Sequence, residues 1–289
     1  MSIAESELVL NNDGSIYHLK LHPEEIARDI IVVGDPGRVP SISAYFDRIE
    51  VQRQNREIVT HTGYIGSKRL TVLSTGMGTD NIDIVLNELD ALVNIDLKNR
   101  TILSNHTSLN IIRLGTSGAL QPDIPVDSTV MSTHGIGIDG MLYYYSSLKD
   151  VYDREMTDAF IQQSNWDANF PRPYAVAASE KLLNLFSSGH LSGITATAPG
   201  FYGPQGRKLR LETTHPDLNE AISGFRYNGQ RIVNFEMETS ALYGLGKMLG
   251  HETLTICAII ANRVIKKYSS DYKITVKKLI EQVLEKLSG

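Results

Sequence analysis

Residues 70–93 read LTVLSTGMGTDNIDIVLNELDALV, and this stretch joins a strand pattern to a helix pattern through glycines. Its first five residues are mostly apolar and β-branched, as in a buried strand. Beyond the glycine-containing turn at 75–78, apolar residues recur at intervals of three and four, which is the spacing of one helix face. A strand, a glycine turn and a helix in succession predict an α/β fold.

Other segments continue this alternation. A polar connection at 66–69 separates two extended runs and predicts a hairpin, and the polar stretch at 97–110 is expected to be a surface loop or insertion. The pattern predicts a single domain over residues 1–289, with a mixed, mostly parallel central sheet flanked by helices on both faces. The expected strands lie at 29–34, 57–65, 70–74, 111–114, 128–131, 190–198, 231–235 and 253–261, and the clearest helices at 79–93, 241–249 and 272–287.

The composition is that of a globular protein and excludes several classes. Of 289 residues, 42% are apolar and 21% are charged, so disordered and collagen-like chains are excluded. No apolar run approaches the roughly 20 residues that span a bilayer, and a net charge of −5 argues against nucleic-acid binding. Residues 1–14 carry no secretory pattern, so a cytoplasmic location is expected. The single cysteine, Cys257, lies in an apolar run and is expected in the core.

The glycines at 76 and 78 open a helix after a strand, as in a dinucleotide-binding motif. That motif needs a third glycine, and the next strand needs a terminal acid for a ribose hydroxyl. Here the third glycine is missing, and the next strand runs into Arg113-Leu114-Gly115. The chain also lacks a Gly-Lys-Ser/Thr phosphate loop, a His-Glu-x-x-His motif and a Gly-x-Ser-x-Gly motif. Dehydrogenase, metal-hydrolase and serine-nucleophile chemistry are therefore disfavoured.

Two arginines beside glycine-rich segments predict an anion site. Residues 34–38 follow the first strand and end in Arg38, and Arg113 precedes a glycine-rich segment at 115–118. Open α/β sheets bind ligands at the carboxyl ends of their strands, where a guanidinium beside the backbone N–H groups of a turn suits phosphate. An arginine in an apolar strand also needs a partner, and a buried acid such as Glu238 is the alternative to an anionic ligand.

A glycine- and proline-rich loop and one carboxylate supply further recognition groups. Gln205 and Arg207 present donors and acceptors that suit the edge of a planar heterocycle, and Phe201 and Tyr202 suit stacking on it. Glu238 lies at an expected helix start, where an ionised carboxylate accepts hydrogen bonds from two vicinal hydroxyls. A ribose diol is such a partner, and a first-turn acid that complements the helix dipole is the structural alternative.

These segments, in this order, resemble the nucleoside phosphorylase family from about residue 17 to the end. Within that family the Gln-x-Arg loop is similar to that of the uridine-directed members. Purine-directed relatives carry an aspartate on the strand that corresponds to 253–261, placed to protonate the purine, and residues 259–263 hold none here. The resemblance rests on Val33-Gly34-Asp35-Pro36-Gly37-Arg38-Val39, Ser74-Thr75-Gly76-Met77-Gly78, Arg113-Leu114-Gly115-Thr116-Ser117-Gly118, residues 201–207 and Asn234-Phe235-Glu236-Met237-Glu238.

The resemblance implies phosphorolysis of uridine to uracil and ribose 1-phosphate, with inorganic phosphate as co-substrate and no cofactor. It also implies that Arg56 reaches the phosphate, and His18 the ribose, of a neighbouring subunit, so a homodimer would be the smallest active unit, with a hexamer as the larger alternative. The implied roles are phosphate binding by Gly34, Arg38, Arg56, Arg113 and Thr116, ribose binding by His18, Met237 and Glu238, base binding by Phe201, Gln205 and Arg207, and catalysis by Arg113, Gln205, Arg207 and Glu238.

Two points stay open in the sequence. Glu57 matches a family position linked to potassium between subunits, but the family's partner serine is replaced by Asn81, so no metal is assigned. An enzyme of the same fold with broader or purine specificity is the first alternative to a uridine enzyme. A nucleoside-binding protein without catalysis is the second.

Overall fold

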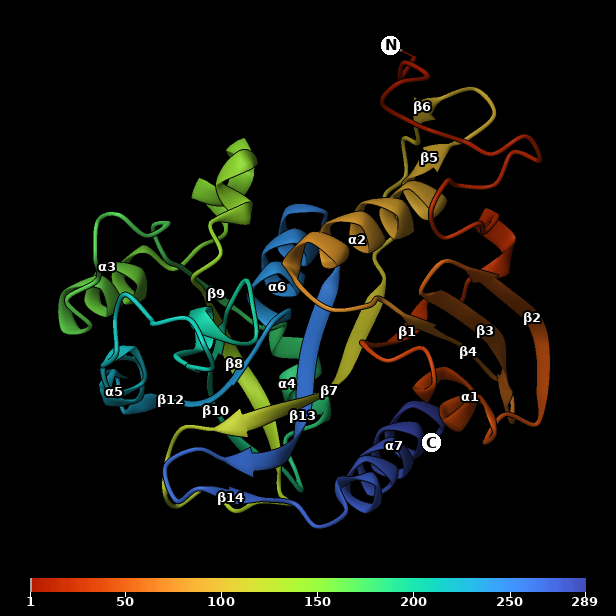
Figure 1. Cartoon of the computed structure of the whole chain (residues 1–289). Helices are drawn as coiled ribbons and strands as arrows, with labels where there is room; N and C mark the ends of the chain where they lie inside the picture. Colours follow the sequence, from red (N-terminus) through yellow and green to blue (C-terminus); the bar gives the residue numbers. More distant parts are fainter. Residues whose placement is uncertain (1) are drawn as a thin grey trace.

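The computed structural model describes residues 2–289, and one large mixed sheet organises the chain (Figure 1). The strands lie in the order β11-β12-β10-β8-β13-β7-β1-β4-β3-β2, with β9 on β8 and β14 on β13. An additional pairing of β12 with β7 joins the two ends of the five-strand run β12-β10-β8-β13-β7, so that this part of the sheet closes on itself. The strands are β1 (Asp29–Val33), β2 (Arg48–Asn55), β3 (Ile58–Ile65), β4 (Lys68–Ser74), β7 (Asn110–Ala119), β8 (Thr129–Gly137), β9 (Tyr174–Ala177), β10 (Leu191–Thr197), β11 (Arg226–Tyr227), β12 (Gln230–Glu236), β13 (Glu252–Asn262) and β14 (Lys267–Tyr268).

Strand directions confirm a mixed α/β sheet with a parallel centre. β1 runs parallel to β4 and β7, β7 runs parallel to β13, and β10 runs parallel to β8 and β12. Antiparallel pairs join β2, β3 and β4 at one edge, and β8 to β13 within the sheet. The parallel strands therefore bring several carboxyl ends to one edge of the sheet.

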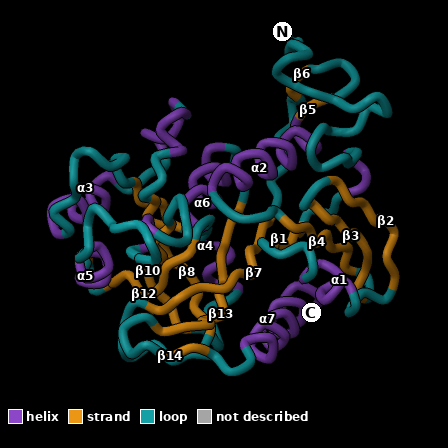
Figure 2. Tube along the Cα trace, viewed as in Figure 1, coloured by secondary structure: helices purple, strands orange, loops and turns teal. Residues whose placement is uncertain are grey.

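Helices lie on both faces of the sheet. In Figure 1, α2 and α6 lie side by side above the central strands, and α1 and α7 lie below them, while Figure 2 shows how loops connect these layers. Among residues 2–289, no helix is long and apolar enough to cross a membrane. The helices are α1 (Arg38–Ser43), α2 (Thr79–Asn94), α3 (Arg154–Gln163), α4 (Glu180–Leu185), α5 (Leu218–Gly224), α6 (Thr239–Met248) and α7 (Tyr272–Ser288).

The structure confirms most predicted elements and corrects one. The segment 115–118, predicted to form a glycine-rich turn, lies inside β7, where it pairs with β13 and, at Gly118, with β12. These long-range partners satisfy its backbone groups, so the strand continues past the glycines. The polar stretch at 97–110 lies at the surface and contributes to a small hairpin of β5 (Ile95–Asp96) and β6 (Thr101–Ile102). The sequence analysis missed β2, α1 and α5.

The buried centre of β7 predicts a sharp contrast between two isoleucine truncations. Ile112 is fully buried in the core, whereas Ile102 on β6 is 75% exposed. We expect Ile112→Ala to lower the free energy of unfolding by about 2–5 kcal/mol, because it removes apolar contacts and leaves a cavity. Ile102→Ala should change it by about 0.5 kcal/mol or less. Urea denaturation of both variants measures this contrast, and equal losses would contradict the assigned core.

Candidate active site

A cavity of about 710 Å³ lies at the carboxyl ends of the parallel strands. The ends of β1, β4, β7, β12 and β13 and the loop after β10 surround it, which is where open α/β sheets bind ligands. This one cavity gathers most of the predicted site residues, which come from segments far apart in the sequence. Those that line it are Gly34, Arg38, Arg113, Thr116, Phe201, Gln205, Arg207, Met237 and Glu238.

Arg113 is held between two carboxylates at the floor of the cavity. Its Nη2 donates to Glu238 Oε2, and its Nη1 lies 3.3 Å from Glu236 Oε2. All three side chains are about 95% buried or more. Burial alone would lower the pKa of Arg113, but the charges of Glu238 and Glu236 outweigh it and raise that pKa. The buried-acid alternative considered for Arg113 is therefore present, within the cavity itself.

The two carboxylates are fixed by the chain entering α6. Glu236 accepts hydrogen bonds from the backbone N–H groups of Glu238 (3.0 Å) and Thr239 (3.0 Å), and from the Thr197 hydroxyl (2.8 Å). Glu238 accepts one from the backbone N–H of Gly78 at 2.9 Å. Burial raises the pKa of Glu236, and the neighbouring Arg113 opposes this rise. Both acids are thus part of the helix start as well as of the cavity.

Arg38 provides a second guanidinium in the same wall. Its Nη1 donates to the carbonyl of Leu114 at 2.9 Å, which ties the start of α1 to β7. Burial lowers the pKa of Arg38, with a further contribution from Arg113, so the two cations lie close enough to repel each other. A site that holds two neighbouring guanidinium groups in its wall favours an anionic ligand. Gly34 and Thr116 line the cavity beside them.

The loop after β10 forms another part of the cavity wall. Arg207 Nη1 donates to Gln205 Oε1 (2.6 Å) and to the carbonyl of Phe201 (2.6 Å), and its guanidinium stacks 3.8 Å from the centre of the Phe201 ring. Gln205 is 3% exposed, whereas Phe201 is half exposed. Burial lowers the pKa of Arg207. Contacts within the loop therefore hold the amide and the guanidinium side by side.

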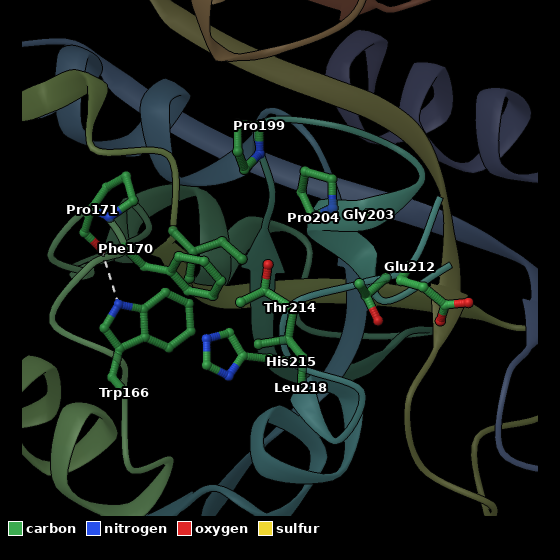
Figure 3. Close-up of a pocket in the computed structure, with 12 residues that line it drawn as sticks. Trp166, Phe170, Pro171, Pro199, Gly203, Pro204, Glu212, Thr214, His215 and Leu218 are labelled. Atoms are coloured by element: carbon green, nitrogen blue, oxygen red, sulfur yellow. Dashed lines mark hydrogen bonds between the residues drawn. The ribbon is translucent and has the colours of Figure 1, made fainter. Parts of the chain in front are cut away.

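A second, smaller cavity of about 280 Å³ lies behind this loop. Figure 3 shows Trp166, Phe170 and His215 on one side of it and Pro199 and Pro204 on another. Phe170 packs edge-on against His215, with ring centres 4.6 Å apart. Gly203 and Pro204, which belong to the loop that carries Gln205 and Arg207, line this second cavity.

Two predicted residues do not line the cavity of their own chain. His18 lies elsewhere, with its Nδ1 2.6 Å from Glu88 Oε1. Arg56 is exposed in the tight turn between β2 and β3, with φ of +53°. Glu57 and Asn81 lie together around Gly76, where an added Cβ would be 2.3 Å from Asn81 Nδ2 and 3.2 Å from Glu57 Cγ.

The sequence analysis missed parts of the cavity wall. The sequence analysis names Glu236 only within the segment Asn234–Glu238, although its carboxylate contacts Arg113 and accepts from the first backbone N–H of α6. Its place two residues before Glu238 was the available signal. Ile260, Ala261 and Tyr268 also line the cavity. Ile260 and Ala261 lie at the end of β13, and Tyr268 lies on β14, which pairs with that end in a short hairpin. Cys257 is fully buried as expected, and burial raises the pKa of its thiol to about 12.

Comparison with known proteins agrees with this arrangement. A family model described as the phosphorylase superfamily matches residues 28–287. A uridine phosphorylase of Thermococcus kodakarensis is 31% identical over 264 residues, covering 89% of this chain and 80% of the relative. A DeoD-type purine nucleoside phosphorylase of Clostridium perfringens is 28% identical, covering 93% and 97%. The crystal structure of a Trypanosoma brucei nucleoside phosphorylase, described as showing uridine phosphorylase activity, matches with a TM-score of 0.86 at 31% identity, covering 97% and 99%.

Arg38 and Arg113 form the part of the cavity that we call the anion wall. The close approach of Arg113 to Gly115 yields a test of it. A Cβ on Gly115 would lie 2.0 Å from Arg113 Nη1, so Gly115→Ala must displace the guanidinium. We expect a loss of about 1–3 kcal/mol in stability from overpacking. Inorganic phosphate should also bind about tenfold or more weakly, since a charge-assisted contact is lost. Calorimetric titration with phosphate measures the affinity.

Gly224→Ala is the matched control for this variant. An added Cβ there meets no heavy atom within 4 Å, and Gly224 has no positive φ. Unchanged phosphate affinity in Gly115→Ala, or an equal loss in Gly224→Ala, would contradict the assignment of Arg113 to the anion wall.

Proposed function

This chain belongs to the phosphorylase superfamily, and from that premise we propose that it is a uridine phosphorylase, which converts uridine and inorganic phosphate to uracil and ribose 1-phosphate. The observation that carries this proposal is the composition of one cavity. Two guanidinium groups, a carboxylate suited to a diol and a paired amide and guanidinium line the same space. These groups match the phosphate, the ribose and the pyrimidine base in turn.

The proposed phosphate site lies beside Arg38 and Arg113, with Gly34 and Thr116 in the adjoining wall. The ribose lies against Met237 and Glu238, so that its hydroxyls donate to the Glu238 carboxylate. That carboxylate already accepts from Arg113 and from Gly78, so it links the sugar to the phosphate-binding arginine. Substrate positioning by such a rigid set supplies much of the rate advantage of an enzyme.

The base lies against the loop after β10. Arg207 and Gln205 face the carbonyl oxygens and the ring N–H of uracil, and Phe201 covers the ring. A phosphate oxygen attacks C1′ from the face opposite the base while the C1′–N1 bond breaks, and the electron pair of that bond leaves with uracil. Arg207 and Gln205 stabilise the growing negative charge more strongly in the transition state than in the ground state. No covalent enzyme intermediate is needed.

Specificity for uracil over purines is supported by the end of β13. Ile260 and Ala261 line the cavity there, and no carboxylate stands among residues 259–263 to protonate a purine ring. A purine or broad-specificity enzyme is the second candidate, favoured by the similarity to a purine nucleoside phosphorylase. The lack of a carboxylate among residues 259–263, at the end of β13, supports uridine as the preferred substrate.

Charge supports a homodimer as the active unit. The cavity wall of one chain contains three arginines, Arg38, Arg113 and Arg207, against four acids, Asp35, Glu57, Glu236 and Glu238. A further guanidinium beside these groups would strengthen the attraction of the wall for a phosphate dianion. Arg56, exposed at the tip of the β2–β3 turn, supplies it to a neighbouring subunit in this proposal. His18 reaches the neighbour's ribose in the same way.

The reaction is tested by following uracil release from uridine with and without inorganic phosphate, with thymidine and inosine as further substrates. Phosphate-dependent release from uridine, with little from inosine, is expected. Release without phosphate would mean a hydrolase, and preferred cleavage of inosine would establish the purine alternative. No turnover of any nucleoside would favour a nucleoside-binding protein without catalysis and overturn the proposal.

The base-binding role of the loop predicts a selective loss in one variant. Arg207→Ala should reduce kcat/KM for uridine about 100-fold or more, because a donor to the developing charge is lost. Its phosphate affinity and its unfolding midpoint should stay near wild type, since the contacts of Arg207 are with Phe201 and Gln205 of its own loop. The control is Arg210→Ala, an exposed arginine on the same loop that does not line the cavity. Equal kinetics for the two variants would refute the base assignment.

The proposed exchange of Arg56 between subunits predicts complementation. Arg56→Ala and Arg38→Ala chains should each be nearly inactive as homodimers. In a dimer of one chain of each kind, one site carries both substitutions and the other carries neither. An equal, freely exchanging mixture should therefore regain about a quarter of wild-type activity. A mixture as inactive as its components would show that Arg56 acts in its own chain or not at all.

A further inference from the structure

Three side chains outside the cavity form a cluster with nitrogen and oxygen donors. Asp90 on α2, His106 in the surface stretch 97–110 and His251 after α6 each offer one atom, and the three atoms lie within 4.8 Å of one another. α2 and α6 lie side by side (Figure 1), and the surface stretch passes their ends. None of the three residues lines the active-site cavity. We propose that this cluster binds a divalent transition-metal ion of the zinc type.

The buried histidine carries the proposal. The side chain of His251 is fully buried, and its Nε2 lies 3.3 Å from Asp90 Oδ1. Among residues 2–289 this nitrogen has no hydrogen-bond partner, which is costly for a buried polar atom. It points into the cluster, where an ion that replaces the Nε2 proton would bond to this nitrogen.

His106 is oriented as a ligand by its second nitrogen. Its Nε2 lies 2.8 Å from the carbonyl oxygen of Leu249, which only accepts, so Nε2 carries the proton and Nδ1 carries the free lone pair. A histidine ligand commonly donates its other N–H to a backbone carbonyl in this way. Asn94 holds the segment in place, because it accepts from Thr107 N (2.7 Å) and donates to Asp90 Oδ1 (2.6 Å). The ligands thus have the supporting contacts of a built site.

The donor set selects the class of ion. Two imidazoles and one carboxylate suit zinc and similar transition metals, whereas magnesium and calcium prefer a shell of oxygens. Three protein ligands leave a position for water, and the exposed His106 keeps it accessible.

One contact limits the affinity. Leu109 N–H donates to His251 Nδ1 at 3.2 Å, so the ring proton of neutral His251 lies on Nε2. An ion at Nε2 replaces this proton, which is released to solvent, and Nδ1 continues to accept from Leu109. Binding is therefore weaker than in a closed structural zinc centre, and the fold does not depend on the ion.

The location assigns the ion a clamping role rather than a catalytic one. β13 begins one residue after His251 and reaches the active-site cavity near its other end, at Ile260 and Ala261. At about 3.3 Å per residue, roughly 30 Å separates the two sites. An ion shared by Asp90, His106 and His251 would tie the surface stretch to α2 and to the turn between α6 and β13.

Titration of the chelator-treated full chain with Zn²⁺ and Co²⁺ tests the site. We expect one equivalent of either ion per chain, visible absorption bands of bound Co²⁺, a higher unfolding midpoint with Zn²⁺, and no effect of Mg²⁺. His106→Gln and Asp90→Asn should each weaken binding about tenfold or more and abolish the Zn²⁺-dependent rise of the midpoint. His106 is exposed, so its variant should fold normally.

His190→Gln is the matched control, because His190 bonds only to Thr129 on another part of the surface. It should bind both ions as the wild type does. No saturable binding of Zn²⁺ or Co²⁺, or binding that His106→Gln and Asp90→Asn leave unchanged, would overturn the proposal. None of these readouts depends on nucleoside turnover, so the test is independent of the proposed activity.

Discussion

The buried ion pairs of Arg113 are the constraint on which the cavity depends. A guanidinium removed from water is costly, and that cost is offset only where opposite charges and hydrogen bonds are placed well. Glu236 and Glu238 meet this need at the floor of the cavity. Because loss of one partner from such a group leaves a buried charge, at a cost of about 3–5 kcal/mol, the three residues form one unit and not three separate contacts.

This unit links strands that are far apart in the chain. Arg113 lies on β7, and the two acids lie where β12 passes into α6. Pairing of β12 with β7 at Gly118 and Ala119 brings these segments together. Glu236 also accepts from the first backbone N–H groups of α6, where a negative charge is favoured by the helix dipole. The same acids thus stabilise the fold and polarise the site. Arg38, at the start of α1, is joined to this unit through its contact with Leu114 on β7.

Much of the fold and site was predictable from local patterns. Apolar runs and helix spacing placed β1, β4, α2, α6 and α7, and polar residues just after predicted strands identified the cavity because parallel strands end at one edge. The path of β7 through 115–118 was not predictable, since it depends on hydrogen bonds from β12 and β13. β2 was missed because its side chains are mostly exposed and polar. The pairing of Glu236 with Arg113 depends on that same long-range register, so only proximity to Glu238 hinted at it.

The most direct test of this account is a crystal structure with inorganic phosphate and a non-reactive uridine analogue bound. The account predicts the phosphate within hydrogen-bond distance of Arg38 and Arg113, the ribose hydroxyls on Glu238, and the base edge on Gln205 and Arg207. An anion bound away from Arg113, or a nucleoside bound with its base remote from Gln205 and Arg207, would contradict it.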